Sequence, residues 1–235
     1  MAIQRDSGPR WPFYKGEKIT IDDARKCKQA YFACISFVDA QIGRIMDALE
    51  ANKLMDDTLI VVWSDHGYFL GEKGLWYKRK NFERSLRVPL IIAGGGVNAQ
   101  IQSCDRPVEL LDLYPTIVDH TGYEVPSVLE GESLVPLMND PSGTWDKPAI
   151  SQVIYSRGEA FGFSLRNQRW RYTEWKKGAA GRELYDHAND PDEVTNLAEN
   201  PEHAALIEKL SAQLKPYAET MSMASKPPKI GGKHK

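Results

Sequence analysis

An aspartate and a histidine stand side by side at Asp65 and His66, and Gly67 follows them. They come one residue after the apolar, β-branched run Leu59–Trp63, which is typical of a buried strand. In open α/β sheets, ligands bind beyond the carboxyl ends of strands, so both side chains are well placed for a site. A carboxylate suits a hard divalent cation, and an imidazole can add a nitrogen ligand. An aspartate after a strand can equally cap a helix, and the pattern alone does not decide between the two.

A single lysine, Lys78, ends the next segment, in which Gly71 and Gly74 frame a turn. A flexible ammonium near a metal centre is the group that an anionic substrate such as sulfate or phosphate requires. The alternative is a solvated surface lysine, which is the position of most lysines. Lys78 therefore joins Asp65 and His66 as a candidate site residue.

Aromatic and basic side chains near Lys78 and on later strands are candidates for substrate contacts. An arginine on a C-terminal strand can meet a carboxylate or a further sulfate on a sugar. Each candidate is equally compatible with an ordinary surface position. The candidates are Lys73, Trp76, Tyr77, Arg157 and Arg166, with Arg79 and Lys80 as further residues at the mouth of a pocket.

The other histidines and the cysteines are interpreted as structural. No carboxylate or cysteine lies at a useful spacing from His120, His187 or His203. Cys27 and Cys34 are seven residues apart, share one helix face and are expected to be small core residues. The three cysteines of the chain form neither a disulfide framework nor a metal-type spacing.

A long helix is predicted ahead of the Asp-His pair. Thr20 and Asp23 form a capping box at its start, and apolar residues then recur every three or four positions as far as Asn52. This periodicity predicts an amphipathic helix that packs on a core.

Strands and helices alternate after this helix. The strand at 58–63 is apolar on both faces, as in a parallel sheet, and a second buried strand is predicted at 88–92. A helix is predicted at 108–121, ending before Gly122. The alternation predicts an α/β fold, a sheet covered by helices. Glu83 and Arg87 are expected to pair on a short helix.

The pattern changes beyond residue 140 to short strands separated by turn residues, at 149–154, 160–166 and 170–175, which predicts a small antiparallel sheet. Asn200 and Pro201 begin a terminal helix. The predicted division is an irregular segment at 1–19, an α/β part at 20–140, a small antiparallel subdomain with a helix at 141–224 and a disordered tail at 225–235.

The composition excludes several classes of function. The chain has 235 residues, 42% hydrophobic and 26% charged, with a formal net charge of −2 and no long basic run. This argues against a nucleic-acid or membrane-surface partner. The longest apolar stretch has the length of a strand, and residues 1–20 contain no signal-peptide core. The localisation therefore stays open.

Several ordered segments closely resemble the type I sulfatases, nearest to the iduronate-2-sulfatase and choline-sulfatase branch. Together they cover roughly residues 20–215. The matching segments are Ala30–Gly43, Thr58–Gly67, Leu70–Lys78, Phe82–Glu83, Arg87–Ile91, Val108–Thr116, Leu129–Leu137, Glu183–Asp186, Asn189–Pro191 and Thr195–Leu197.

The resemblance implies an alkaline-phosphatase-like α/β domain followed by a small C-terminal sheet. It implies a formylglycine nucleophile made in a C-x-P/A-x-R type motif, and Ca²⁺ (or Mg²⁺) as Lewis acid and template. By position, Asp65 and His66 match two metal ligands, and Lys78 matches the lysine that contacts the sulfate group. The expected substrate is a sulfated small molecule or sugar. Family members are commonly periplasmic, secreted or lysosomal.

The sequence departs from the family in one important respect. Neither the cysteines nor Ser7 fit the nucleophile motif, and the family carries that motif in an N-terminal half ahead of the long helix. We therefore expect this chain to be the C-terminal half of a sulfatase, with the missing N-terminal half as its partner, and to be inactive alone. Lys73 stands where this branch often has histidine.

Two alternatives stay open. The chain can be a non-catalytic, sulfatase-derived binding module or a decayed fragment. It can also belong to a phosphodiesterase or phosphonate hydrolase of the same superfamily, because these enzymes share the Asp-His metal element. The residues around Lys78 favour sulfate.

Overall fold

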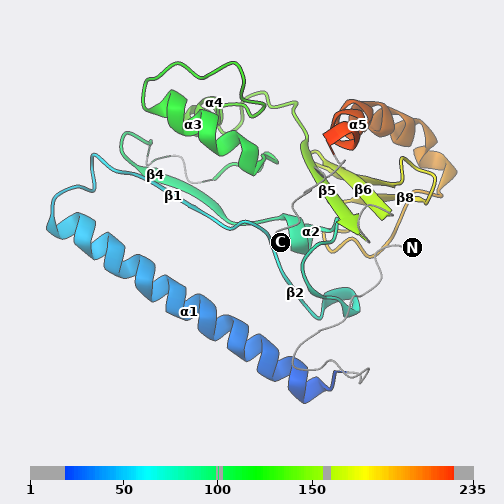
Figure 1. The fold of residues 1–235 in the computed structure, drawn as a ribbon, viewed down its shortest axis with the longest axis horizontal. Helices are drawn as coiled ribbons and strands as arrows, with labels where there is room; N and C mark the ends of the chain where they lie inside the picture. Colours follow the sequence, from blue (N-terminus) through cyan, green and yellow to red (C-terminus); the bar gives the residue numbers. More distant parts are fainter. Residues whose placement is uncertain (1–18, 99, 101–102, 156–159, 225–235) are drawn as a thin grey trace, which may run out of the picture. The chain divides into compact units, whose positions relative to one another are not determined.

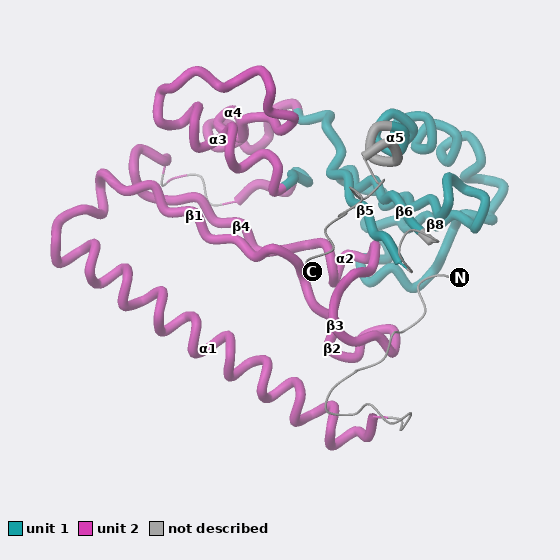
Figure 2. The backbone as a smooth tube through the Cα atoms, viewed as in Figure 1, with its two compact units in different colours: residues 1–3, 106–109, 145–235 teal, residues 4–105, 110–144 magenta. Residues whose placement is uncertain are grey.

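The computed structural model of the chain describes residues 19–98, 100, 103–155 and 160–224. It divides into two compact units, which are described separately (Figure 2). The site unit comprises residues 4–105 and 110–144, and the sheet unit comprises residues 1–3, 106–109 and 145–235. The predicted irregular segment, apart from residue 19, and the predicted tail at 225–235 lie outside the described residues.

The site unit begins with one long helix, α1 (Ile21–Ala51), drawn in blue in Figure 1. The Thr20 hydroxyl accepts a hydrogen bond from the backbone N–H of Asp23 at 3.1 Å, and the Asp23 carboxylate accepts from the backbone N–H of Thr20. The helix ends at Asn52, whose backbone N–H bonds back to the carbonyl of Ala48. The predicted capping box and both helix ends are therefore confirmed.

The apolar face of α1 is largely exposed. No residue of the helix is buried, and Phe32, Phe37, Val38 and Ile45 are 58%, 67%, 54% and 61% exposed. The expectation that Cys34 is a small core residue is wrong, because it is exposed as well. The reason is that the described residues cover only parts of the helix, chiefly where α1 meets β2.

Among the described helices, none combines the length and apolar composition that a membrane crossing requires.

The strand before the Asp-His pair, β1 (Leu59–Trp63), lies beside β4 (Leu90–Gly94) in a two-stranded sheet (Figure 1). The two strands are antiparallel, with Val61 opposite Ile92. The predicted parallel pairing is therefore wrong for these strands. The segment between them contains a tight hairpin and a short helix rather than a long crossover helix, so it returns the chain beside its own path.

A small hairpin and a one-turn helix fill the segment between β1 and β4. The hairpin pairs β2 (Phe69–Leu70) with β3 (Trp76–Tyr77) around the 3₁₀ turn Glu72–Gly74, and α2 (Glu83–Leu86) follows. Its apolar side chains make a local core, and the buried members are Phe69, Leu75, Trp76 and Phe82. Glu83 and Arg87 pair at 3.9 Å, as predicted.

The rest of the site unit contains two short helices. The predicted helix at 108–121 is observed as a 3₁₀ turn, Leu110–Asp112, that continues into α3 (Leu113–His120). Gly122 follows the helix with a φ of 79°, the left-handed conformation expected of a residue after a helix end. The last helix of the unit is α4 (Val135–Asn139).

The sheet unit is a four-stranded antiparallel sheet with strands in sequence order. Its strands are β5 (Ala149–Tyr155), β6 (Ala160–Arg166), β7 (Trp170–Trp175) and β8 (Arg182–Asp186). The first three strands and their antiparallel pairing confirm the prediction, whereas β8 was not predicted as a strand.

One face of this sheet packs on the terminal helix, α5 (Ala204–Ala224). Asn200 caps the 3₁₀ turn Pro201–His203 that leads into it, through a hydrogen bond from the backbone N–H of Glu202 to the Asn200 side chain. The buried core joins both elements, and its members are Phe163, Leu165, Tyr172, Leu184, Ile207, Leu210, Leu214 and Ala218. The α/β class with a C-terminal antiparallel sheet and a terminal helix is thus confirmed.

Candidate functional site

The Asp-His pair lies just beyond the end of β1. A carboxylate oxygen of Asp65 (Oδ2) is 3.3 Å from Nε2 of His66. The Asp65 side chain is 81% exposed and that of His66 is 30% exposed. The two groups therefore present an oxygen and a nitrogen donor together, in a position that a solute can reach.

The imidazole of His66 is held by its other ring nitrogen. Nδ1 lies 2.8 Å from the carbonyl oxygen of Gly67, and a carbonyl only accepts hydrogen bonds, so the ring proton belongs on Nδ1. The hydroxyl of Ser64 donates to the carbonyl of His66 at 3.0 Å and fixes the backbone of the same turn. Nε2 is thereby left as a hydrogen-bond acceptor, 3.3 Å from the carboxylate of Asp65. A hydrogen bond from the second ring nitrogen to a carbonyl is the usual support of a metal-binding histidine.

Lys78 meets the same ring nitrogen. Its ammonium nitrogen lies 2.6 Å from Nε2 of His66. An ammonium only donates, so this contact again requires the lone pair on Nε2. The flanking residues Tyr77 and Arg79 have φ values of 68° and 70°, which are unusual for residues other than glycine. Such strained backbone is concentrated at functional sites, and here it brackets the lysine of the candidate site.

Gly67 allows the turn to pass close to α2. Its backbone N–H donates to the carbonyl of Ser85 at 2.9 Å. A β-carbon on Gly67 would lie 2.3 Å from the backbone carbonyl oxygen of Arg84. Glycine is therefore required by close backbone contact, whereas the sequence alone suggests only that it keeps a pocket open.

Three tyrosines connect α1 to the hairpin that carries Lys78. The ring of Tyr68 stacks on Tyr31 of α1 with centroids 5.3 Å apart, and it meets Tyr77 edge-on at 5.9 Å. Burial is the main cause that raises the pKa of Tyr68, and the neighbouring Tyr77 and Tyr31 raise it further. Spacing along the sequence gives no sign of this cluster, because its members come from three different elements.

The donors of Asp65 and His66 fit one cation in their separation. Two adjacent ligand atoms at about 2.4 Å from a Ca²⁺ ion are about 3.4 Å apart when they subtend a right angle. Oδ2 of Asp65 and Nε2 of His66 are 3.3 Å apart. A carboxylate suits Ca²⁺, Mg²⁺ and Mn²⁺, and the imidazole nitrogen suits transition metals such as Zn²⁺. Two ligands are fewer than the six to eight that Ca²⁺ takes, so further oxygen ligands must complete such a site.

The other predicted substrate contacts are placed differently. Trp76 is 7% exposed and Lys80 is 1% exposed, so both lie in the interior rather than at a pocket mouth. The ammonium of Lys73 lies 4.9 Å from the ring centre of Phe82. Tyr77 is partly buried, and Arg79 is exposed. These placements leave the substrate roles as predictions.

The two predicted arginine contacts belong to the sheet unit. Arg166 is partly buried at the end of β6, and its guanidinium donates to the carbonyl of Asn167. Arg157 lies outside the described residues.

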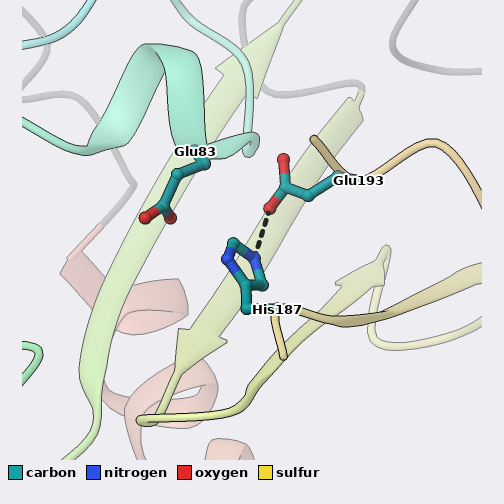
Figure 3. A group of neighbouring side chains, drawn as sticks. All are labelled: Glu83, His187 and Glu193. Atoms are coloured by element: carbon teal, nitrogen blue, oxygen red, sulfur yellow. Dashed lines mark hydrogen bonds and ion pairs between the residues drawn. The ribbon is translucent and has the colours of Figure 1, made fainter. Parts of the chain in front are cut away.

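One histidine in the sheet unit has a carboxylate partner that the sequence did not reveal. Nε2 of His187 lies 3.1 Å from Glu193, drawn with a dashed line in Figure 3, and the same carboxylate accepts from Arg171 at 2.5 Å. All three side chains are at most 6% exposed. Sequence spacing gave no sign of this carboxylate partner of His187. Glu83, in the same view, belongs to the site unit.

Two further histidines of the described residues, His120 and His203, make local contacts. Nε2 of His120 lies 2.6 Å from the carbonyl of Gly95, and His203 meets the ring of Trp170 edge-on.

Two family models match the chain. The model described as Sulfatase matches residues 8–123, and the model described as N-sulphoglucosamine sulphohydrolase, C-terminal, matches residues 71–220. The second match alone covers more than half of the chain, and the two overlap across the hairpin that carries Lys78.

Similar proteins point in the same direction. The choline-sulfatase of Rhizobium meliloti is 38% identical over 191 residues, which are 80% of this chain and 36% of that protein. Among solved structures, a 2-O GAG sulfatase aligns with a TM-score of 0.77 and 27% identity, over 86% of this chain and 45% of that one. A phosphonate monoester hydrolase from Silicibacter pomeroyi aligns with a TM-score of 0.76 and 28% identity, over 89% and 44%. The chain thus spans about a third of the length of the curated relative and less than half of each solved chain.

Proposed function

Because this chain belongs to the sulfatase family, we propose that it supplies part of the metal and sulfate site of a sulfuric-ester hydrolase. The proposed roles are cation ligands for Asp65 and His66 and a sulfate contact for Lys78. The observation that carries the proposal is that Nε2 of His66 lies 3.3 Å from the Asp65 carboxylate and 2.6 Å from the Lys78 ammonium. Two ligands for a cation and one ammonium for an anion thus meet at one ring nitrogen.

The chemistry follows from these groups. A bound Ca²⁺ or Mg²⁺ would act as a Lewis acid that polarises the sulfate oxygens of the ester. Asp65 and His66 would hold the ion through the oxygen and nitrogen described above. Lys78 would neutralise negative charge on the ester, which is largest in the transition state. Tyr77 and Tyr68 would keep the lysine aimed at the site.

The nucleophile is proposed to come from a partner segment. No C-x-P/A-x-R motif occurs in the sequence, so the formylglycine that this family uses would be supplied by an N-terminal half. The exposed apolar face of α1 supports this proposal, because a large apolar surface commonly marks an interface. Further cation ligands would come from the same half.

The proposed substrate class is a sulfated small molecule or sugar. Two similar proteins carry names of this kind, a choline-sulfatase and a 2-O GAG sulfatase. The contacts of Arg157 and Arg166 with further anionic groups of such a substrate stay predictions from the sequence.

A second candidate is hydrolysis of a phosphonate or phosphodiester. It is supported by the likeness to a phosphonate monoester hydrolase, with a TM-score of 0.76. A cation with a neighbouring ammonium serves either ester, because both carry negatively charged oxygens.

The test is a comparison of ester hydrolysis by the purified chain, alone and combined with an N-terminal half from a related sulfatase. The chain alone should not turn over an aryl sulfate, whereas the combination should do so in a Ca²⁺-dependent way. Normal turnover by the chain alone would contradict the proposed division of the site. Faster hydrolysis of an aryl phosphonate than of an aryl sulfate by the combination would favour the second candidate.

A further inference from the structure

One nitrogen atom of the candidate site serves two purposes. Nε2 of His66 is the ring nitrogen available to a cation, because Nδ1 is engaged with the carbonyl of Gly67. The same Nε2 accepts the ammonium of Lys78 at 2.6 Å. A single lone pair cannot accept a hydrogen bond and bind a cation at the same time.

From this conflict we infer an exchange at His66, in which the Lys78 ammonium and the cation compete for Nε2. Cation binding breaks the Lys78–His66 contact and releases the ammonium, which can then contact the anion. The inference rests on the proposed cation site and adds an order of events to it. The cation binds first, and Lys78 becomes a sulfate contact as a result.

The surroundings of Lys78 support movement of its side chain. Lys78 is exposed, and its side chain is long and flexible, so the ammonium can shift by a few ångströms without disturbing a core. The neighbouring Tyr77 packs its ring edge-on against Tyr68. The proposed movement therefore involves the lysine side chain alone.

Charge repulsion also opposes simultaneous occupancy by the cation and the ammonium. A divalent cation between Asp65 and His66 would stand within a few ångströms of the present ammonium position, where two positive charges repel strongly at short range. A tetrahedral anion on the cation then offers the displaced ammonium a new partner of opposite charge. Cation binding thus makes the Lys78 ammonium available to the sulfate group of the substrate.

The test measures Mn²⁺ affinity of the purified chain from the paramagnetic broadening of its NMR signals. Lys78→Met, which removes the competing ammonium, should tighten Mn²⁺ binding roughly tenfold or more, the size of one hydrogen bond to a charged group. Lys73→Met is the matched control, because it removes a positive charge from the same hairpin while the Lys78–His66 contact stays. It should tighten binding much less.

The His66→Gln variant separates two effects of Lys78 on Mn²⁺ affinity, its contact with the imidazole and its positive charge. In that background Lys78→Met should tighten Mn²⁺ binding less than it does in the parent chain, because the charge repulsion remains but the imidazole contact no longer exists. A second readout is the proximity signal between the Lys78 side chain and the His66 ring, which should disappear at saturating Ca²⁺.

The outcomes distinguish the exchange from the site itself. Equal effects of Lys78→Met and Lys73→Met, or a proximity signal that persists at saturating Ca²⁺, would overturn the exchange and leave the cation site standing. Failure of every variant to bind Mn²⁺ near Asp65 would overturn the proposed cation site, and the exchange with it.

Discussion

The ammonium nitrogen of Lys78 lies 2.6 Å from Nε2 of His66, although twelve positions separate the two residues in the chain. The β2–β3 hairpin produces this contact, because its antiparallel strands bring Lys78 back beside His66. The same hairpin is tied to α1 through Tyr68 and Tyr31. The candidate site therefore depends on the packing of this small segment, and the predictions below test that packing and the chemistry it supports.

Replacement of Gly67 by alanine should destabilise the site unit. The added β-carbon would meet the backbone carbonyl of Arg84 at 2.3 Å, so α2 or the Asp-His turn must move. Overpacking of this kind costs about 1–3 kcal/mol of unfolding free energy, measured by urea denaturation. Gly43→Ala is the matched control, because a β-carbon on Gly43 meets nothing within 4 Å, and in mid-helix it should stabilise by about 1 kcal/mol. Equal effects of the two variants would contradict the proposed close contact.

Tyr68 should act as the connection between α1 and the lysine hairpin. Tyr68→Ala removes the ring that contacts both Tyr31 and Tyr77, and it should lower the unfolding free energy by about 1–3 kcal/mol. Amide exchange of Lys78 and its neighbours should accelerate at the same time. Tyr68→Phe keeps the ring and should behave like the parent chain. If alanine and phenylalanine have the same effect on exchange at Lys78, the ring does not position the hairpin.

Stability of the sheet unit should fall in acid through Asp186. Its carboxylate accepts two hydrogen bonds from Arg169, at 2.9 and 2.8 Å, and this guanidinium is the main cause that holds the pKa of Asp186 well below its ordinary value. A lowered folded-state pKa contributes stability above the unfolded-state value of about 4, and the contribution is lost as the pH falls through the folded-state pKa. Thermal unfolding between pH 5 and pH 2, followed by tryptophan fluorescence, measures this loss.

Arg169→Gln should flatten that acid dependence, because Asp186 then titrates nearer its ordinary value. Arg25→Gln is a suitable control, because it breaks the exposed pair of Arg25 with Asp22, and exposed pairs contribute little. An unchanged pH profile in Arg169→Gln would exclude Asp186 as the group responsible.

The exposed apolar face of α1 should make the isolated chain self-associate. Phe37 is 67% exposed and Val38 is 54% exposed on this helix. Phe37→Glu should lower the average mass measured by analytical ultracentrifugation, because a charge on the face opposes apolar contact. Gln29→Glu adds the same charge at another exposed position of the helix and should change the mass less. A monomeric parent chain would contradict the idea that this face needs a partner.

Much of the fold could be predicted because its signals are local. The capping box of Thr20 and Asp23 depends on residues three positions apart, and the strands of the sheet unit are bounded by turn residues. The antiparallel direction of the pairing between β1 and β4 could not be predicted, because buried strands have the same apolar sequence pattern in parallel and antiparallel sheets. The strand β8 was missed because it is short and its alternating pattern includes charged residues.

The family resemblance predicts Asp65, His66 and Lys78 as site residues, and their roles stay predictions. The contact between His66 and Lys78 could not be predicted, because it depends on how the hairpin closes. The partner of His187 was missed for the same reason, because a loop brings Glu193 back to it. Contacts of this kind depend on how hairpins and loops fold back, and the spacing of residues along the sequence does not determine this.

The most direct test of the account is cation binding by Asp65. Mn²⁺ added to the chain should broaden the NMR signals of Asp65, His66 and Lys78 first, and Asp65→Asn should weaken this binding by about tenfold or more, as loss of a charged ligand implies. Asp57→Asn, at the exposed residue near the start of β1, should leave the binding unchanged. Broadening that is equal in the parent chain and Asp65→Asn, or that centres on other acidic residues, would contradict the account.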